Sequence, residues 1–197
     1  KDYIKIITPS WASSYPFLRF FGVQTFFLGE LKKNQINILF CPGGTVPVFS
    51  NVPLIVMLQN MLPFDLRESK LFGITSFFFW KMLVLRVIQT LSLIKADGAI
   101  FLSNYAKNQI LKKLLIRVPS NVIIPHGIEK RFKTKSKSCR TIVRAVFTEK
   151  KPLRILYISD FLPYKHHLEV LSAVKDNLMK GRFINLTLIG SATSKYA

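Results

Sequence analysis

The hydrophobic pattern of the chain predicts repeated alternation of strands and helices. Short apolar runs rich in β-branched residues indicate buried strands, whereas apolar residues at helical spacing indicate helices. The predicted strands are residues 1–8, 37–41, 52–58, 96–103, 121–128, 153–158 and 184–189. The predicted helices are residues 17–31, 77–94, 104–114 and 168–178. Alternation of this kind is typical of an α/β fold with parallel sheets.

Residues 153–189 form the clearest βαβ unit, and a polar loop follows its first strand. This loop carries Asp160, Lys165, His166 and His167 immediately before the predicted helix. In open α/β sheets, ligands bind at the carboxyl ends of the strands. A cation beside a helix N-terminus suits an anionic ligand.

Loops after the earlier strands carry further candidates. Gly43 and Gly44 allow positive φ and close approach of a ligand, although any tight turn would use them. Gln59 and Asn60 follow the strand 52–58, where an open sheet places ligand contacts; a purely structural loop is the alternative. Ser103 is expected to cap the next helix. The strand 121–128 ends in a Pro-His-Gly turn.

The longest apolar run, 77–94, is long enough for a transmembrane helix, but it contains Lys81 and Arg86. Four polar residues fall within roughly a third of the helical circumference: Lys81, Gln89, Ser92 and Lys95. We therefore expect an amphipathic helix with its opposite, apolar side packed on the sheet. Partial exposure toward a membrane surface is the alternative.

Residues 129–151 are crowded with Lys and Arg and lack hydrophobic periodicity. They are typical of an exposed linker, so we predict a first domain at 1–132, a basic linker at 133–151 and a second domain at 152–197.

The charge of the chain indicates which kinds of partner it could bind. Its 29 Lys and Arg against 10 Asp and Glu give a net charge of +19. Such a field attracts nucleic acid, anionic lipid or phosphorylated substrates, although biased codon usage would also produce it. No nucleic-acid motif is present, and aromatic residues do not alternate with basic ones. Cys41 and Cys139 lack metal-ligand spacing, which favours free thiols in a reducing compartment.

Five sequence segments, taken together and in their order along the chain, resemble those of a known protein family. They are FCPGGT (40–45), NVPLIVMLQNMLPF (51–64), ADGAIFLSNYAK (96–107), VIIPHGIEKRF (122–132), and ILYIS (155–159) with YKH (164–166). Together they resemble family-four glycosyltransferases of GT-B fold, in particular a bacterial subgroup that makes cell-surface polysaccharides.

The resemblance implies two Rossmann-like domains facing one another across a cleft. The second domain would hold a nucleotide-sugar donor and the first a glycan or lipid-linked acceptor. Transfer would retain the anomeric configuration, with neither a metal nor a further cofactor. A cytoplasmic protein without a nucleic-acid partner is implied, and its charge would suit peripheral contact with the inner face of an anionic membrane.

Residue roles carry over by position. Lys165 would bind the donor diphosphate; Asp160 stands where many members have arginine, and His166 where they have glycine. His126 and Gly127 would lie beside the donor, and Ser103 is placed in the same cleft. Gln59 and Asn60 replace a histidine and its polar partner, so they would bind sugar or acceptor hydroxyls, on the side of Gly43 and Gly44. No catalytic residue is assigned.

Two parts of the family pattern fall outside the chain: a first strand with its Gly-rich loop before Lys1, and a paired-glutamate motif after Ala197. We therefore expect an internal fragment, inactive alone, with its second domain truncated after one βαβ unit. Two alternatives remain. One is a basic module that binds nucleic acid or membranes, and the other is a sugar-nucleotide epimerase of GT-B fold.

Overall fold

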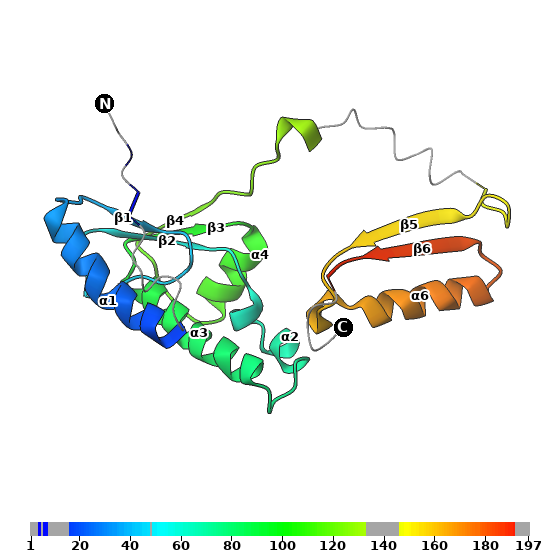
Figure 1. Cartoon of the computed structure of the whole chain (residues 1–197), viewed down its shortest axis with the longest axis horizontal. Coiled ribbons are helices and arrows are strands. Elements are labelled where there is room, and N and C mark those ends of the chain that lie inside the picture. The colour runs from blue at the N-terminus through cyan, green and yellow to red at the C-terminus, as the bar shows by residue number, and fades with distance from the viewer. Residues whose placement is uncertain (1–3, 5, 8–15, 48, 133–145, 192–197) are drawn as a thin grey trace. The chain divides into compact units, whose positions relative to one another are not determined.

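The computed structural model describes residues 4, 6–7, 16–47, 49–132 and 146–191, with only the backbone described at 16–21 and 23–24 (Figure 1). The chain divides into two compact units. The first comprises Lys1–Leu66 and Phe77–His126, and the second comprises Arg67–Ser76 and Gly127–Ala197.

The first unit contains a parallel sheet, which confirms the predicted α/β class. Its strands are β1 (Leu39–Cys41), β2 (Leu54–Leu58), β3 (Gly98–Phe101) and β4 (Ser120–Ile123), in the order β1-β2-β3-β4. All neighbouring pairs are parallel, and Val56 of β2 lies opposite Cys41 of β1 and Ala99 of β3. The carboxyl ends of these strands therefore share one edge of the sheet.

The helices of the first unit lie where the sequence predicted them. They are α1 (Pro16–Lys33), α3 (Phe77–Lys95) and α4 (Asn104–Lys107), the last continued by a π-helical turn (Asn108–Lys112). Figure 1 shows all three below the sheet in its view. The predicted cap of α4 is confirmed, because Ser103 Oγ accepts a hydrogen bond from the Ala106 N–H at 3.1 Å.

The core of the first unit lies on one face of the sheet. Leu54, Val56 and Leu58 alternate inward along β2, and they join Leu93 of α3 and Phe101 of β3 in one buried cluster. The β1 thiol of Cys41 packs against this cluster, and burial raises its pKa. On the opposite face, Phe40 and Val122 remain about half exposed.

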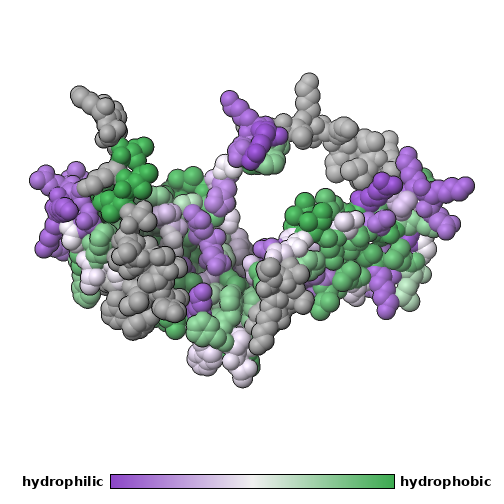
Figure 2. Space-filling view, in the orientation of Figure 1, coloured by the Kyte–Doolittle hydropathy of each residue, from purple (hydrophilic) through white to green (hydrophobic). Residues whose placement is uncertain are grey.

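The second unit contains the predicted βαβ arrangement. β5 (Leu153–Ile158) and β6 (Ile184–Ile189) pair in parallel, and α6 (His167–Met179) connects them. Their bounds match the predicted strands. Within residues 146–191 no side chain is fully buried, and Figure 2 shows hydrophobic surface over β5 and β6. Leu156, Ile158 and Ile189 are among the exposed residues.

A short segment between β2 and α3 also belongs to the second unit. It begins within α2 (Leu66–Lys70) and ends at Ser76. Ser69 and Phe72 are its buried residues, and the Phe72 ring lies 5.9 Å from that of Tyr164.

The orientation predicted for α3 is wrong at two positions. Gln89 and Ser92 are only 4% and 1% exposed, although the sequence placed them on the outer, polar side. Both face the loop after β1. The Val46 N–H donates to Ser92 Oγ at 3.2 Å, and the same hydroxyl donates to the Ile88 carbonyl at 2.8 Å. A polar residue with such partners can be buried, so polarity alone did not identify the outer face.

Two further predictions fall partly outside the described residues. The strand expected at 1–8 is described only at Ile4, Ile6 and Ile7, which lie outside any strand. Of the expected linker, residues 146–151 are described, and they contain a tight turn closed by a bridge between Thr148 and Lys151.

Candidate functional site

The loop that leaves β5 is held against the end of β6. The Ser159 N–H donates to the Ile189 carbonyl at 2.9 Å, and the Phe161 N–H donates to the Ser191 carbonyl at 3.2 Å. Asp160 Oδ1 accepts a long hydrogen bond from the Ser191 N–H at 3.4 Å. A side chain at Gly190 would collide with the Ser159 carbonyl. Glycine at 190 is therefore needed for this close approach of the two strand ends.

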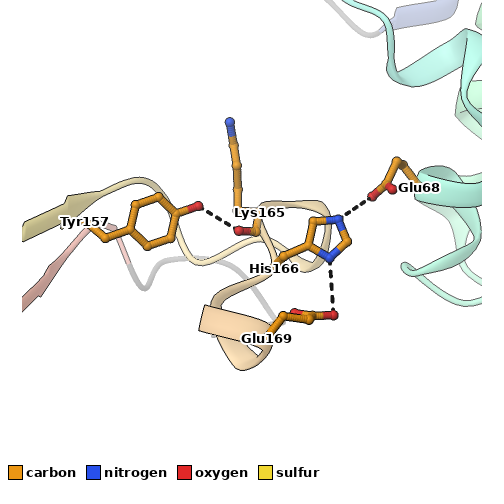
Figure 3. A network of polar contacts seen from close by, with 5 residues as sticks. All are labelled: Glu68, Tyr157, Lys165, His166 and Glu169. Carbon is orange, nitrogen blue, oxygen red and sulfur yellow. Dashed lines mark hydrogen bonds and ion pairs between the residues drawn. The ribbon is translucent and has the colours of Figure 1, made fainter. Parts of the chain in front are cut away.

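Lys165 lies in a single 3₁₀ turn, Pro163–Lys165, which ends immediately before α6. Its backbone carbonyl accepts a hydrogen bond from the Tyr157 hydroxyl at 2.7 Å, so the strand and the turn are joined. Its Nζ lies 4.9 Å from the centre of the Tyr164 ring. Figure 3 shows the side chain extending away from the neighbouring carboxylates. Among the described residues, no carboxylate forms an ion pair with Lys165.

His166 connects two acidic side chains from different segments. Its Nε2 lies 3.0 Å from Glu68 Oε2, and its Nδ1 lies 3.2 Å from Glu169 Oε1 (Figure 3). The hydrogen bond to Glu169 is the main reason that the pKa of His166 is raised, and the charge of Glu68 adds to it. The Glu169 carboxylate accepts from its own backbone N–H and from His166, which together lower its pKa.

The backbone at His166 is left-handed, with φ of 55° and ψ of 40°. A side chain at such a position is strained, and glycine is the residue that usually occupies it. This conformation turns the chain from the Lys165 turn into α6, and His166 provides no side-chain cap for that helix.

His167 was not assigned a role from the sequence, although it begins α6. Its ring lies 4.8 Å from the ring centres of both Tyr157 and Phe161. Its Nε2 is buried, and no partner for it is present in the described part of the chain. The sequence shows aromatic residues near His167, at Tyr157 and Phe161. It does not show that their rings contact His167, because this contact depends on the fold.

The second-unit loop offers a cation and a helix N-terminus side by side. The first backbone N–H groups of a helix lack intrahelical partners and carry partial positive charge. Lys165 adds a full charge next to them. When His166 is protonated, its pairing with Glu169 offsets a negative charge in the first turn of α6 that would repel an anion.

The carboxyl edge of the first sheet carries the other predicted residues. Each follows a different strand of the parallel sheet: Gly43 and Gly44 follow β1, Gln59 and Asn60 follow β2, Ser103 follows β3, and His126 follows β4 with Gly127 next to it. Because the strands are parallel, the structure brings these loops to the same edge.

Gly44 is explained by packing. It has φ of 77°, and a Cβ atom there would lie 2.7 Å from Gln89 Nε2 and 2.8 Å from Leu58 Cδ2. Gly43 differs, since a Cβ atom at that position would meet nothing within 4 Å. Gln89 Oε1 is buried beneath this loop, and it finds no partner within the described residues. The second glycine is therefore required by the fold, whereas the first leaves space on the surface.

Two of the predicted polar residues stabilise local turns. Asn60 Oδ1 accepts a hydrogen bond from the Leu62 N–H at 3.0 Å, and Ser103 caps α4. Gln59, His126 and Gly127 are exposed. Asn60 and Ser103 are exposed too, so a ligand could reach all four of these side chains at this edge, two of which also hold a local turn.

A groove of the second unit lies away from Lys165. It has a volume of about 540 Å³ and is lined mainly by apolar residues of α6 and β6, including Leu171, Val174 and Leu186. Over the described ranges no three His, Cys, Asp or Glu side chains gather in a way that could hold a metal ion.

Neither a scan against models of known protein families nor a search of curated proteins found a match for this chain. The candidate site is therefore defined by its geometry and by the sequence segments that first indicated it.

Proposed function

We propose that this chain is part of a retaining glycosyltransferase of GT-B fold that takes a sugar from a nucleotide-sugar donor. The observation that carries the proposal is the position of Lys165, in the turn between a parallel strand and the N-terminus of α6. The two units would be the two Rossmann-like domains of that fold. The proposed acceptor is a glycan or lipid-linked sugar of a cell-surface polysaccharide.

The chemistry explains why this position matters. During transfer, the bond between the sugar and the diphosphate breaks, and the diphosphate leaves with the bonding electrons. The acceptor hydroxyl forms the new bond and loses its proton. Positive groups placed where negative charge develops lower the barrier, and they act most strongly where water is excluded. Lys165 and the first N–H groups of α6 provide such groups.

The backbone at His166 supports the same assignment. The resemblance implies glycine at this position, and a φ of 55° is a conformation that glycine adopts without strain. Histidine keeps the conformation here while its ring contacts Glu68 and Glu169. In its protonated form the imidazole would offset acidic charge beside the proposed diphosphate site. Asp160 remains within the same loop, held by Ser191.

The first-unit edge would serve the sugar and the acceptor. Gln59 has a neutral amide, so its proposed role is hydrogen bonding to hydroxyl groups and not proton transfer. Gly43 leaves the surface open beside it. His126 and Gly127 are proposed to contact the donor. Asn60, Ser103 and Gly44 would shape the surrounding loops, because their described contacts are structural.

The test compares two lysines that lie ten residues apart in the second unit. Lys165→Ala removes the proposed diphosphate contact, whereas Lys175→Ala removes an exposed lysine from α6. The protein would be expressed from its full reading frame and assayed with UDP- and GDP-sugar donors. We expect Lys165→Ala to lower kcat about a hundredfold, as loss of one charge-stabilising group commonly does. Lys175→Ala should retain the parent turnover.

Equal turnover in the parent and Lys165→Ala proteins would contradict the proposed role of Lys165 in binding the diphosphate. Failure of every nucleotide sugar to bind, measured by calorimetry with the parent protein, would contradict the proposed function itself. Conversion of the donor to an epimer without acceptor would identify the alternative reaction on the same fold.

A further inference from the structure

Helix α3 exposes a continuous line of large apolar side chains. This apolar stripe consists of Phe77, Trp80, Val84, Val87, Leu91 and Ile94, each between 52% and 82% exposed. The residues alternate at spacings of three and four, so they occupy one side of the helix along its whole length. Single exposed apolar residues are normal on protein surfaces, but a contiguous line of six indicates an interaction surface.

The opposite side of α3 is fixed in the core. Met82 and Leu93 are buried, and Ser92 is hydrogen-bonded to the loop after β1 through the Val46 N–H. Gln89 packs against Gly44 in the same loop. The helix therefore cannot rotate to bury the apolar stripe without breaking these contacts.

Charge beside the stripe favours an anionic occupant. Lys81 and Lys95 are exposed, and they flank the apolar stripe near its two ends, roughly 21 Å apart along the helix. No acidic residue occurs between Phe77 and Lys95, and the whole chain carries a net charge of +19. An apolar line with lysines at its edge is the arrangement of helices that lie in the interface of an anionic membrane.

We propose that the apolar stripe of α3 docks on an anionic lipid surface, with the helix lying in the plane of the interface. Trp80 would sit at the level of the headgroups, which suits its large ring with a polar N–H. Lys81 and Lys95 would contact lipid phosphates. The proposal does not depend on sugar transfer, because any activity of the protein could be held at the membrane in this way.

Lying on the membrane fits this helix better than crossing it. Within the described residues α3 is the helix long and apolar enough to span a bilayer, and 28% of its apolar window is buried in the protein. That buried side contains Gln89, which packs against Gly44, and Ser92, whose hydroxyl accepts from the Val46 N–H of the loop after β1. A spanning arrangement would remove Ser92 from the Val46 N–H and place the Gln89 amide in a medium without water.

Fluorescence of Trp80 provides the direct measurement. The chain contains two tryptophans, so Trp11→Phe makes Trp80 the only one. This protein would be mixed with vesicles of phosphatidylcholine alone or with phosphatidylglycerol added. We expect Trp80 emission to shift to shorter wavelength and to be quenched by brominated lipid in the anionic vesicles. Neutral vesicles should bind more weakly.

Two sets of variants separate the apolar and charged contributions. Val84→Gln with Leu91→Gln should lower the vesicle partition coefficient at least tenfold, because two apolar side chains no longer enter the interface. Lys81→Gln with Lys95→Gln should remove roughly tenfold of the preference for anionic lipid. The matched control is Leu168→Gln with Met179→Gln, two exposed apolar residues of α6 that should leave partitioning unchanged.

Circular dichroism would verify that each variant remains folded. The proposal is overturned if the parent does not bind anionic vesicles, or if Val84→Gln with Leu91→Gln binds as tightly as the parent. A concentration-dependent dimer that the same double variant abolishes, without vesicle binding, would identify a second copy as the occupant instead. Vesicle binding by a protein that binds no nucleotide sugar would support this inference while contradicting the proposed function.

Discussion

Strands β2 and β5 have similar apolar sequences, but they reach different degrees of burial. Leu54, Val56 and Leu58 of β2 are at most 2% exposed, whereas Leu156 and Ile158 of β5 are 55% and 68% exposed. β2 has a neighbour on each side and helices over one face; within the described residues, β5 pairs with β6 alone. An apolar strand therefore produces a core only where neighbouring elements cover it.

The two units also differ in what holds them together. The first unit depends on apolar packing around Leu93 and Phe101. The loop region of the second unit depends on polar and aromatic contacts. The Tyr157 hydroxyl donates to the Lys165 carbonyl, the His166 ring lies between two carboxylates, and the His167 ring contacts the Tyr157 ring. We expect the first unit to respond mainly to changes in volume, and this loop region to changes in charge and pH.

The largest expected difference between the two units is the loss of unfolding free energy when a large apolar side chain is truncated to alanine. Phe101→Ala removes a ring that is 0% exposed at the centre of the first sheet, and we expect a loss of about 3–5 kcal/mol in unfolding free energy. Leu156→Ala in β5 is the counterpart on an exposed face, where a change within about 0.5 kcal/mol is expected. Urea unfolding measures both. Equal losses would show that the two strands are buried alike in solution.

A smaller effect is expected at the glycine pair after β1. Gly44→Ala places a side chain at φ of 77° and against Gln89, so we expect a loss of at least about 1–2 kcal/mol. Gly43→Ala meets no neighbouring atom and serves as the control. Thermal unfolding of the two variants provides the comparison. A stable Gly44→Ala protein would mean that this loop adopts another conformation.

The smallest expected effect concerns pH and the second unit. The pKa of His166 is raised, so its contribution to stability is complete below its unfolded pKa of about 6.5 and is lost as pH rises through the folded pKa. The pKa of Glu169 is lowered, so its contribution is lost as pH falls through that folded value. The pair should therefore stabilise the loop most at mildly acidic pH.

NMR titration of the His166 ring measures this directly. Glu169→Gln should lower the titration midpoint, and Glu68→Gln should lower it by a smaller amount. Glu149→Gln, which changes an exposed carboxylate outside this cluster, should leave it unchanged. Unchanged midpoints in the first two variants would show that the imidazole does not contact these carboxylates in solution.

Much of the fold could be predicted from hydrophobic periodicity. The bounds of β5 and β6 agree with their apolar runs, since β5 lies between Pro152 and Ser159 and β6 ends before Gly190. Periodicity was insufficient for α3, where Gln89 and Ser92 are polar and yet buried. The Ser92 hydroxyl accepts from a backbone N–H of the loop after β1, 46 residues away, and Gln89 packs against Gly44 of the same loop. No local pattern contains that information.

The candidate site shows the same boundary between local and distant information. The position of Lys165 between a strand and a helix followed from the order of residues. The contact of His166 with Glu68 joins residues 98 positions apart, so it could not be inferred from spacing. The structural role of Gly44 likewise required the location of Gln89.

The half-buried thiol of Cys41 lies in β1, at one edge of the described first sheet. Its reaction rate can therefore report how often β1 separates from the sheet. The thiolate is the form that attacks an alkylating reagent, and burial both raises the pKa of the Cys41 thiol and restricts access to it. In a Cys139→Ser background, iodoacetamide would react mainly during brief separations of β1 from β2. The ratio of this rate to the rate of an unprotected thiol would give the free energy of local opening of β1.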